Sequence, residues 1–232
     1  MKSKKMLVWI LIVVGIIILI NLPKKQIIIG NPITQIDKNP SIISDDSSIG
    51  ISPWSNLDNA RINDNLYATS STGASGSPQP QELSIKLVKN GQIVGNEQSA
   101  SNLLSTTDTD YVYGAFNYLW GTSWMPSDIN SNNFGITISY MGGDRTHYLK
   151  STNFGFNIPS DAVISGIKAT IRSSYYTSQL KIVRIDSVLL SVYYSSVQSP
   201  YSLFLGIKDN YLLNFYDFNQ FISSANNQWI SQ

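Results

Sequence analysis

The stretch LSIKLVKNGQIVG, residues 83–95, is the clearest indicator of the fold class. Every second residue from Leu83 to Leu87 is apolar, and the pair Asn90-Gly91 follows this run. Alternation with a period of two is typical of a β-strand, and Asn-Gly supplies the two positive-φ positions of a type I′ turn. The stretch therefore predicts two antiparallel strands joined by a tight hairpin.

Three more stretches have the periodicity of strands. Residues 134–140 (FGITISY) and residues 163–171 (VISGIKATI) each place a set of side chains on one face. Residues 182–194 (IVRIDSVLLSVYY) predict one long strand, or two, with a bulge near residues 186–188 because the alternation slips there. The sets predicted to share a face are Phe134, Ile136 and Ile138 in the first stretch, and Val163, Ser165, Ile167, Ala169 and Ile171 in the second.

Composition also favours an all-β body. Charged residues make up 13% of the chain, Glu occurs only at Glu82 and Glu97, and there is no cysteine. Long solvent-facing helices usually use Glu and Lys, whereas hydroxyl and amide side chains suit the polar faces of strands. We predict an antiparallel β-sandwich or jelly roll over residues 51–197, with the Ser-rich residues 68–80 as a surface loop.

The N-terminus carries an uncharged apolar run, MLVWILIVVGIIILINL, at residues 6–22. As a helix this run extends roughly 25 Å, near the lower limit for crossing the hydrocarbon core of a bilayer. We therefore predict one transmembrane helix that anchors the protein through residues 1–25, with flanking lysines that reach the interface. The candidate lipid contacts are Leu7, Trp9, Ile12, Ile16 and Leu19.

A cleaved secretory signal is the competing interpretation, because the lysines of residues 2–5 precede an apolar core of suitable length. Residues 21–25 offer no small-x-small cleavage site, which favours an uncleaved anchor. The N-terminal lysines and the α-amino group outweigh Lys24 and Lys25, so the N-terminus is expected on the cytoplasmic side of a single-pass membrane protein.

Two segments flank the predicted sandwich. Residues 26–50 contain apolar bursts between Asn-Pro pairs and predict an extended spacer, unless residues 27–29 or 42–43 add a strand to a neighbouring sheet. In the aromatic-rich tail, residues 198–232, Asp209 can cap a helix that continues to residue 223. The tail packs on its own sandwich or docks on a neighbouring subunit, and its candidate partner contacts are Tyr211, Phe215, Phe218, Phe221 and Trp229.

Little in the chain points to catalysis. After the anchor, 11 basic residues face 15 acidic ones without a basic stripe, so nucleic acid is not an expected partner. The single histidine, His147, is expected in a solvated loop. Asp108 and Asp110 could serve a calcium site or a glycosidase, but too few ligands accompany them. We predict no enzyme, with no catalytic residue, cofactor or metal.

Paired tyrosines raise the possibility of a sugar-binding face. Tyr175-Tyr176 and Tyr193-Tyr194 place neighbouring rings on opposite faces of a sheet. One ring of each pair is therefore expected in the core and the other toward solvent. Packing against another protein explains the same residues.

Four blocks of the sequence resemble a known module. Residues 113–136 (YGAFNYLWGTSWMPSDINSNNFGI), 153–167 (NFGFNIPSDAVISGI), 184–194 (RIDSVLLSVYY) and 54–60 (WSNLDNA) carry the similarity. Together they resemble a β-sandwich module that recurs in structural proteins of tailed bacteriophages and other viruses. The resemblance spans roughly residues 52–195 and implies a sandwich with a structural role in a virus. The second block follows the first here and precedes it in the family, so a rearranged strand order is expected.

Anchor, sandwich and tail together lead us to expect a viral structural protein, either a minor capsid protein or a protein of the virion membrane. It would join a lipid bilayer to neighbouring virion or surface proteins. The alternative is a virion or cell-surface adhesin that binds glycan through the sandwich.

Overall fold

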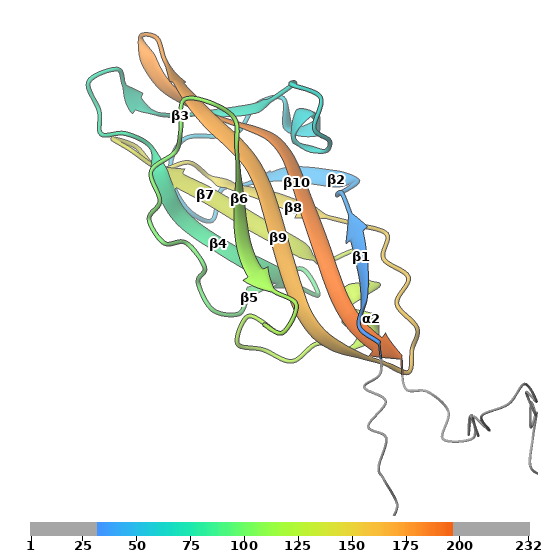
Figure 1. The fold of residues 1–232 in the computed structure, drawn as a ribbon. Helices are drawn as coiled ribbons and strands as arrows, with labels where there is room; N and C mark the ends of the chain where they lie inside the picture. The colour runs from blue at the N-terminus through green and yellow to red at the C-terminus, as the bar shows by residue number, and fades with distance from the viewer. Residues whose placement is uncertain (1–31, 197–232) are drawn as a thin grey trace, which may run out of the picture. The chain divides into compact units, whose positions relative to one another are not determined.

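The computed structural model describes residues 32–196, which form two antiparallel five-stranded sheets around one hydrophobic core (Figure 1). The all-β prediction is therefore confirmed for these residues. In the first sheet the order is β1-β10-β9-β6, and β3 also pairs with β10. The strands of this sheet are β1 (Thr34–Lys38), β3 (Ala68–Ala74), β6 (Thr109–Ala115), β9 (Ala162–Thr177) and β10 (Leu180–Ser196).

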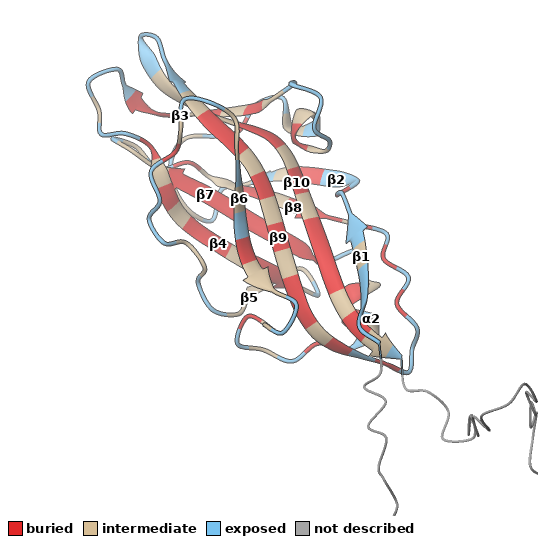
Figure 2. Cartoon of the chain, viewed as in Figure 1, coloured by how far each residue is buried: buried red, intermediate tan, exposed pale blue. Residues whose placement is uncertain are grey.

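The second sheet has the order β2-β8-β7-β4-β5. Its strands are β2 (Ile42–Asp46), β4 (Gln81–Lys89), β5 (Gln92–Val94), β7 (Gly135–Met141) and β8 (Tyr148–Thr152). A 3-10 turn, η1 (Leu57–Ala60), and a short helix, α2 (Pro126–Ile129), lie in the connections. Buried residues alternate along the long strands and line the space between the two sheets (Figure 2).

The predicted hairpin is confirmed. Strands β4 and β5 pair antiparallel, and Asn90 and Gly91 between them have φ angles of 51° and 83°. These values match the two left-handed positions of a type I′ turn. The alternation differs at Leu83, which is the extra residue of a bulge opposite β7, so that Glu82 takes the inward position.

The three other predicted strands are present, with one difference. Phe134, Ile136 and Ile138 are fully buried, as predicted, and β10 is one long strand whose register slips at Asp186. In β9 a second bulge, at Ser165, reverses the faces of the residues before it. Val163 is consequently 57% exposed, and its predicted place beside Ile167, Ala169 and Ile171 is wrong.

Two segments expected to lie outside the sheets are strands. Residues 34–38 pair with β10 and residues 42–46 pair with β8, so this part of the predicted spacer belongs to the sandwich. The alternative interpretation, in which residues 42–43 add a strand to a sheet, agrees better with the structure, but the sheet that they extend belongs to the same sandwich and not to a neighbour. Residues 68–74, expected in a loop, form β3, and burial of Ala68 and Thr72 gives this strand its inner face.

The first of the four blocks, residues 113–136, which contains Leu119-Trp120-Gly121, fills one edge of the core. Trp120 has no exposed surface and donates its indole N–H to the carbonyl of Ile167 at 2.8 Å. Gly114, at φ 76°, lies against this indole, and a side chain there would meet the Ile167 carbonyl oxygen. A carboxylate oxygen of Asp128 accepts the Met125 N–H at 2.8 Å, which caps α2. These contacts explain the block as part of the core and of a helix cap.

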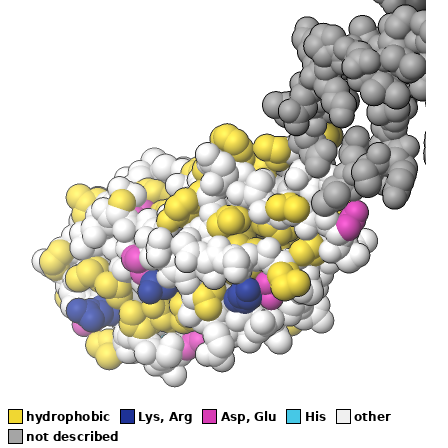
Figure 3. All heavy atoms as spheres, turned by 90° about the horizontal axis from the view of Figure 1, so that it is seen from below, with side chains coloured by type: hydrophobic (Ala, Val, Ile, Leu, Met, Phe, Trp, Pro, Cys, Tyr) yellow, Lys and Arg dark blue, Asp and Glu magenta, His cyan; other side chains and the backbone are white. Residues whose placement is uncertain are grey.

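No helix within residues 32–196 is long and apolar enough to cross a membrane. The predicted anchor, residues 1–25, and the predicted tail, residues 198–232, lie outside the described residues. On the surface seen from below, hydrophobic side chains are scattered among uncharged polar ones, with few charged groups (Figure 3).

Candidate functional site

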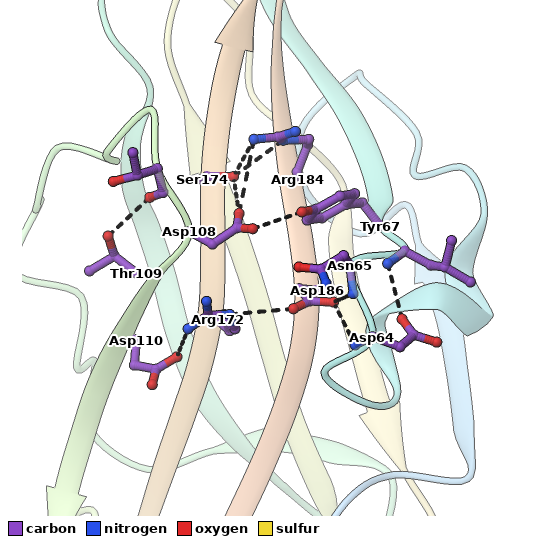
Figure 4. A network of polar contacts seen from close by, with 12 residues as sticks. Asp64, Asn65, Tyr67, Asp108, Thr109, Asp110, Arg172, Ser174, Arg184 and Asp186 are labelled. Carbon is purple, nitrogen blue, oxygen red and sulfur yellow. Dashed lines mark hydrogen bonds and ion pairs between the residues drawn. The ribbon is translucent and has the colours of Figure 1, made fainter.

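A network of charged side chains lies on the outward face of the first sheet, in the half remote from the start of β1 (Figure 4). Strands β9 and β10 supply its arginines, and the connections before β3 and β6 bring in Tyr67 and Asp108. The other two carboxylates, Asp110 and Asp186, lie in β6 and β10. The members are Tyr67, Asp108, Asp110, Arg172, Ser174, Arg184 and Asp186. Three ion pairs lie within it, and Arg172 takes part in two of them.

Asp108 is the acceptor at the centre of one half of the network. It accepts hydrogen bonds from the hydroxyls of Ser174, at 2.5 Å, and Tyr67, at 2.7 Å, and lies 3.9 Å from Arg184. Desolvation by burial acts to raise the pKa of Asp108, but the two hydroxyl donors and the guanidinium outweigh it and lower this pKa. The carboxylate is thus held in its ionised form.

Arg184 contacts two aromatic rings. Its guanidinium carbon is 4.5 Å from the ring centroid of Tyr67 and 5.3 Å from that of Tyr176. It also donates to the hydroxyl of Ser174, at 2.9 and 3.2 Å. The two cation–π contacts and the hydrogen bonds to Ser174 together hold the guanidinium in place.

Asp186 forms the other half of the network and has no exposed surface. Its Oδ1 accepts the backbone N–H groups of Asp64, at 3.2 Å, and Asn65, at 2.9 Å. Its Oδ2 lies 3.4 Å from Nε of Arg172, which pairs with Asp110 at 3.1 Å. Desolvation, together with the nearby charge of Asp108, raises the pKa of Asp186 above its ordinary value.

The charged groups of this network pair with one another. The carboxylates of Asp108 and Asp110 face arginines, so neither is arranged as an open oxygen ligand for a cation. No cluster of His, Cys, Asp and Glu suited to a metal ion occurs in the described part of the chain. These contacts join the connections around residues 64–67 and residue 108 to β9 and β10. The network therefore holds these loops against the first sheet.

The single histidine is held more tightly than a solvated loop residue. Its side chain is 15% exposed, and Nδ1 of His147 lies 2.8 Å from a carboxylate oxygen of Asp45. The other oxygen of Asp45 accepts the Trp54 N–H at 3.0 Å, and the Trp54 indole donates to the His147 carbonyl at 2.8 Å. The expectation of a solvated histidine is therefore wrong, and this group ties β2 to the segment before η1.

The paired tyrosines alternate as predicted. Tyr194 is buried and Tyr175 packs against the core, whereas Tyr176 and Tyr193 lie on the outward face. Opposite Tyr193 in β9 is Gly166, ten residues from Tyr176, which corresponds to roughly 33 Å along the strand. The two outward rings therefore cannot form one sugar platform.

One cavity of about 330 Å³ lies between residues 51–55, residues 69–71 and Ile182. Serine and threonine side chains supply most of its polar groups, and no charged side chain lines it. It lacks the convergent charged groups of a catalytic site.

The chain enters and leaves the sandwich at one end. Thr34, the first residue of β1, is opposite Tyr194, two residues before the end of β10. The two strand ends lie side by side in Figure 1. The predicted anchor contacts and tail contacts all fall outside the described residues, on the segments that continue from these two ends.

Comparisons with models of protein families, with curated proteins and with solved structures find no match to this chain. Sequence reasoning singled out Asp108 and Asp110 but missed Arg172, Arg184 and Tyr67. The signal that could have found part of the network was Asp186, an acidic residue at the slip in an otherwise apolar strand.

Proposed function

We propose that this chain is a non-enzymatic, membrane-anchored structural protein that joins a lipid bilayer to neighbouring protein subunits. Residues 1–25 are the single-pass anchor, and the sandwich and the aromatic-rich tail are the parts that contact other proteins. The viral setting of this proposal, as a minor capsid or virion-membrane protein, depends on the resemblance of four sequence blocks to a viral sandwich module.

One observation carries the proposal, namely that both ends of the described chain lie at the same end of the sandwich. The apolar run at residues 6–22 and the aromatic-rich residues 198–232 therefore join the sandwich at adjacent points. This supports an arrangement in which the end of the sandwich where both chain ends leave is turned to the bilayer, and the tail reaches neighbouring subunits from that same end.

The state of the acidic side chains also supports a structural role. Carboxylates that could act in hydrolysis need open positions across a groove, whereas Asp108 and Asp110 each face an arginine. The Asp108 pair links a loop to β10, and the Asp110 pair links β6 to β9.

Membrane extraction tests the anchor. We expect the full chain to float with phospholipid vesicles and to stay with them in alkaline carbonate, and the fragment of residues 26–232 to remain in the soluble fraction. Release of the full chain by carbonate would contradict the proposal. The viral role fails if mass spectrometry of purified particles of the virus that carries the gene does not detect the protein.

The glycan-binding alternative is favoured by one feature, the 43% exposure of Tyr176 beside the polar network. A glycan array probed with the full chain in detergent separates the two functions. Binding to a defined sugar that is lost in Tyr176→Ala and kept in Tyr193→Ala would establish the adhesin. No binding on the array leaves the structural role as the better explanation.

A further inference from the structure

We infer that the end of the sandwich where β1 begins and β10 ends rests on the phospholipid surface, with Ile33, Phe116 and Val163 in contact with lipid. This inference rests on the proposed membrane anchor and goes beyond it, because an anchored domain can equally stand clear of the bilayer on a tether. These three residues define the terminal face of the sandwich.

Large apolar side chains are exposed on the terminal face. Ile33 is 52% exposed, Phe116 53% and Val163 57%. An exposed group of apolar side chains in one place points to contact with a protein or a membrane.

Contacts place these residues together. Val163 is opposite Ser195, next to the last residue pair of β9 and β10. Ile33 directly precedes Thr34, which is opposite Tyr194. The ring of Phe116 packs edge-on against Tyr193, with 6.5 Å between the ring centroids. The carbonyl of Phe116 accepts a hydrogen bond from Ser165 at 3.1 Å, which holds the Phe116 backbone against the start of β9.

Charge falls off toward the terminal face along the outward side of the first sheet. The remote half carries the ionic network around Arg172 and Arg184. The half near the terminal face presents Val112, Thr170, Leu189 and Tyr193, with Lys168 and Asp37 as the charged side chains on its strands and Asp161 exposed directly before β9. The ammonium of Lys168 lies 5.9 Å from the ring centroid of Tyr193. An amphipathic aromatic ring beside a lysine suits the interface between headgroups and acyl chains.

Chain length argues for lipid over a second copy as the occupant. Residues 23–33 connect the apolar run to β1, and 11 extended residues span at most about 40 Å. A sandwich tethered this closely meets the bilayer at a high local concentration. Lys24 and Lys25 lie in this connection and favour anionic headgroups. Figure 3 shows hydrophobic and uncharged polar side chains, together with an acidic side chain, on the surface beside the grey residues.

Site-directed labelling tests this inference. The chain has no cysteine, so an introduced cysteine is the only thiol that the fluorophore can label. Val163→Cys labels the terminal face, and Leu180→Cys labels the opposite end of β9 and β10, where the side chain is 45% exposed. Each full-length variant carries an environment-sensitive fluorophore in vesicles of phosphatidylcholine and phosphatidylglycerol. We expect lipids with a spin label near the headgroup to quench the Val163 position several-fold more strongly than the Leu180 position.

The outcomes separate this inference from the proposed function. If the chain does not float with the vesicles, the anchor itself fails. If it floats and both labels are equally open to a water-soluble quencher, the terminal face stands clear of lipid and the inference is wrong. A Val163 label that is shielded from both quenchers would mean that the tail or a second copy covers this face, which also overturns it. Phe116→Cys is the second test position, and matching unfolding curves check that each variant folds.

Discussion

Asp108 and Asp186 belong to one network but have opposite electrostatic surroundings. Hydroxyl donors and Arg184 favour the ionised form of Asp108 and lower its pKa. Burial without exposed surface disfavours the ionised form of Asp186 and raises its pKa. A pKa that differs between the folded and unfolded states makes stability depend on pH, with a sign set by the direction of the shift.

The two carboxylates therefore predict opposite pH profiles. Asp108 contributes stability that is present above its ordinary pKa and is lost as the pH falls through the lowered folded-state value. The contribution of Asp186 is full below its ordinary pKa and is lost as the pH rises through the raised value. Relative to the wild type, we expect the loss of stability in Asp108→Asn to shrink as the pH falls below the ordinary carboxyl pKa of about 4, and that in Asp186→Asn to shrink as the pH rises above it.

Urea unfolding followed by tryptophan fluorescence of the full chain in detergent measures both profiles. Asp37→Asn is the control, because Asp37 is exposed on β1 and its side-chain hydrogen bond goes only to Gln35. Parallel profiles for the two network variants would contradict the assignment.

Gly114 and Gly91 form a matched pair for testing close packing. Both have φ near 80°, at 76° and 83°, but a side chain on Gly91 would meet open space. Gly114→Ala adds a clash with the Ile167 carbonyl and the Trp120 indole to the left-handed strain. We expect it to lower the free energy of unfolding by roughly 2–4 kcal/mol, against about 1 kcal/mol for Gly91→Ala. Equal losses in the two variants, measured by urea unfolding, would mean that backbone strain alone acts at both positions.

Strands β1 and β2 decide where the folded domain begins. Each completes a different sheet, since β1 covers the edge of β10 from Leu190 to Tyr194 and β2 covers the edge of β8. A chain that starts after them would expose two unpaired strand edges, which favours aggregation.

Fragment folding checks this boundary. We expect residues 32–196 to give a cooperative thermal transition and a dispersed amide spectrum. Residues 51–197, the boundary predicted from sequence, should give a poorly dispersed spectrum or an insoluble product. A well-folded fragment of residues 51–197 would show that β1 and β2 are dispensable additions.

The bulges in β9 and β10 shape the first sheet. Asp186 is the extra residue in β10 and Ser165 the extra residue in β9. A bulge changes the direction in which a side chain points, and it increases the local twist of the sheet. Through this device the carboxylate of Asp186 reaches the backbone N–H groups of Asp64 and Asn65.

The two ends of the sandwich differ, because the chain enters and leaves it at the same end. In the proposed role the bilayer and the tail's protein partners are therefore reached from one end. A photocrosslinking amino acid in place of Phe215 or Phe218 is expected to capture a neighbouring protein in the native particle or membrane. The same group in place of Leu180, at the remote end, is the control. Crosslinks only within the chain would place the tail on its own sandwich and contradict the predicted partner contacts.

Local patterns were sufficient for the fold class and for several strands. The Asn90-Gly91 turn, the buried face of β7 and the slip at Asp186 depend on neighbours within one strand or hairpin, so the sequence predicts them directly. The bulge at Ser165 had no such signal, because apolar residues occur on both sides of it and either register looks acceptable.

By itself, the sequence determined that the body of the chain after residue 50 is built of antiparallel sheets, because side-chain alternation and turn chemistry act over a few residues. Only the tertiary structure decided that residues 34–46 belong to the sandwich and that the charged residues form one network. Asp45 meets His147 across 102 positions, and Asp108 meets Ser174 across 66. Such partners are chosen by which strands become neighbours, and this depends on the burial of the whole core rather than on any local pattern.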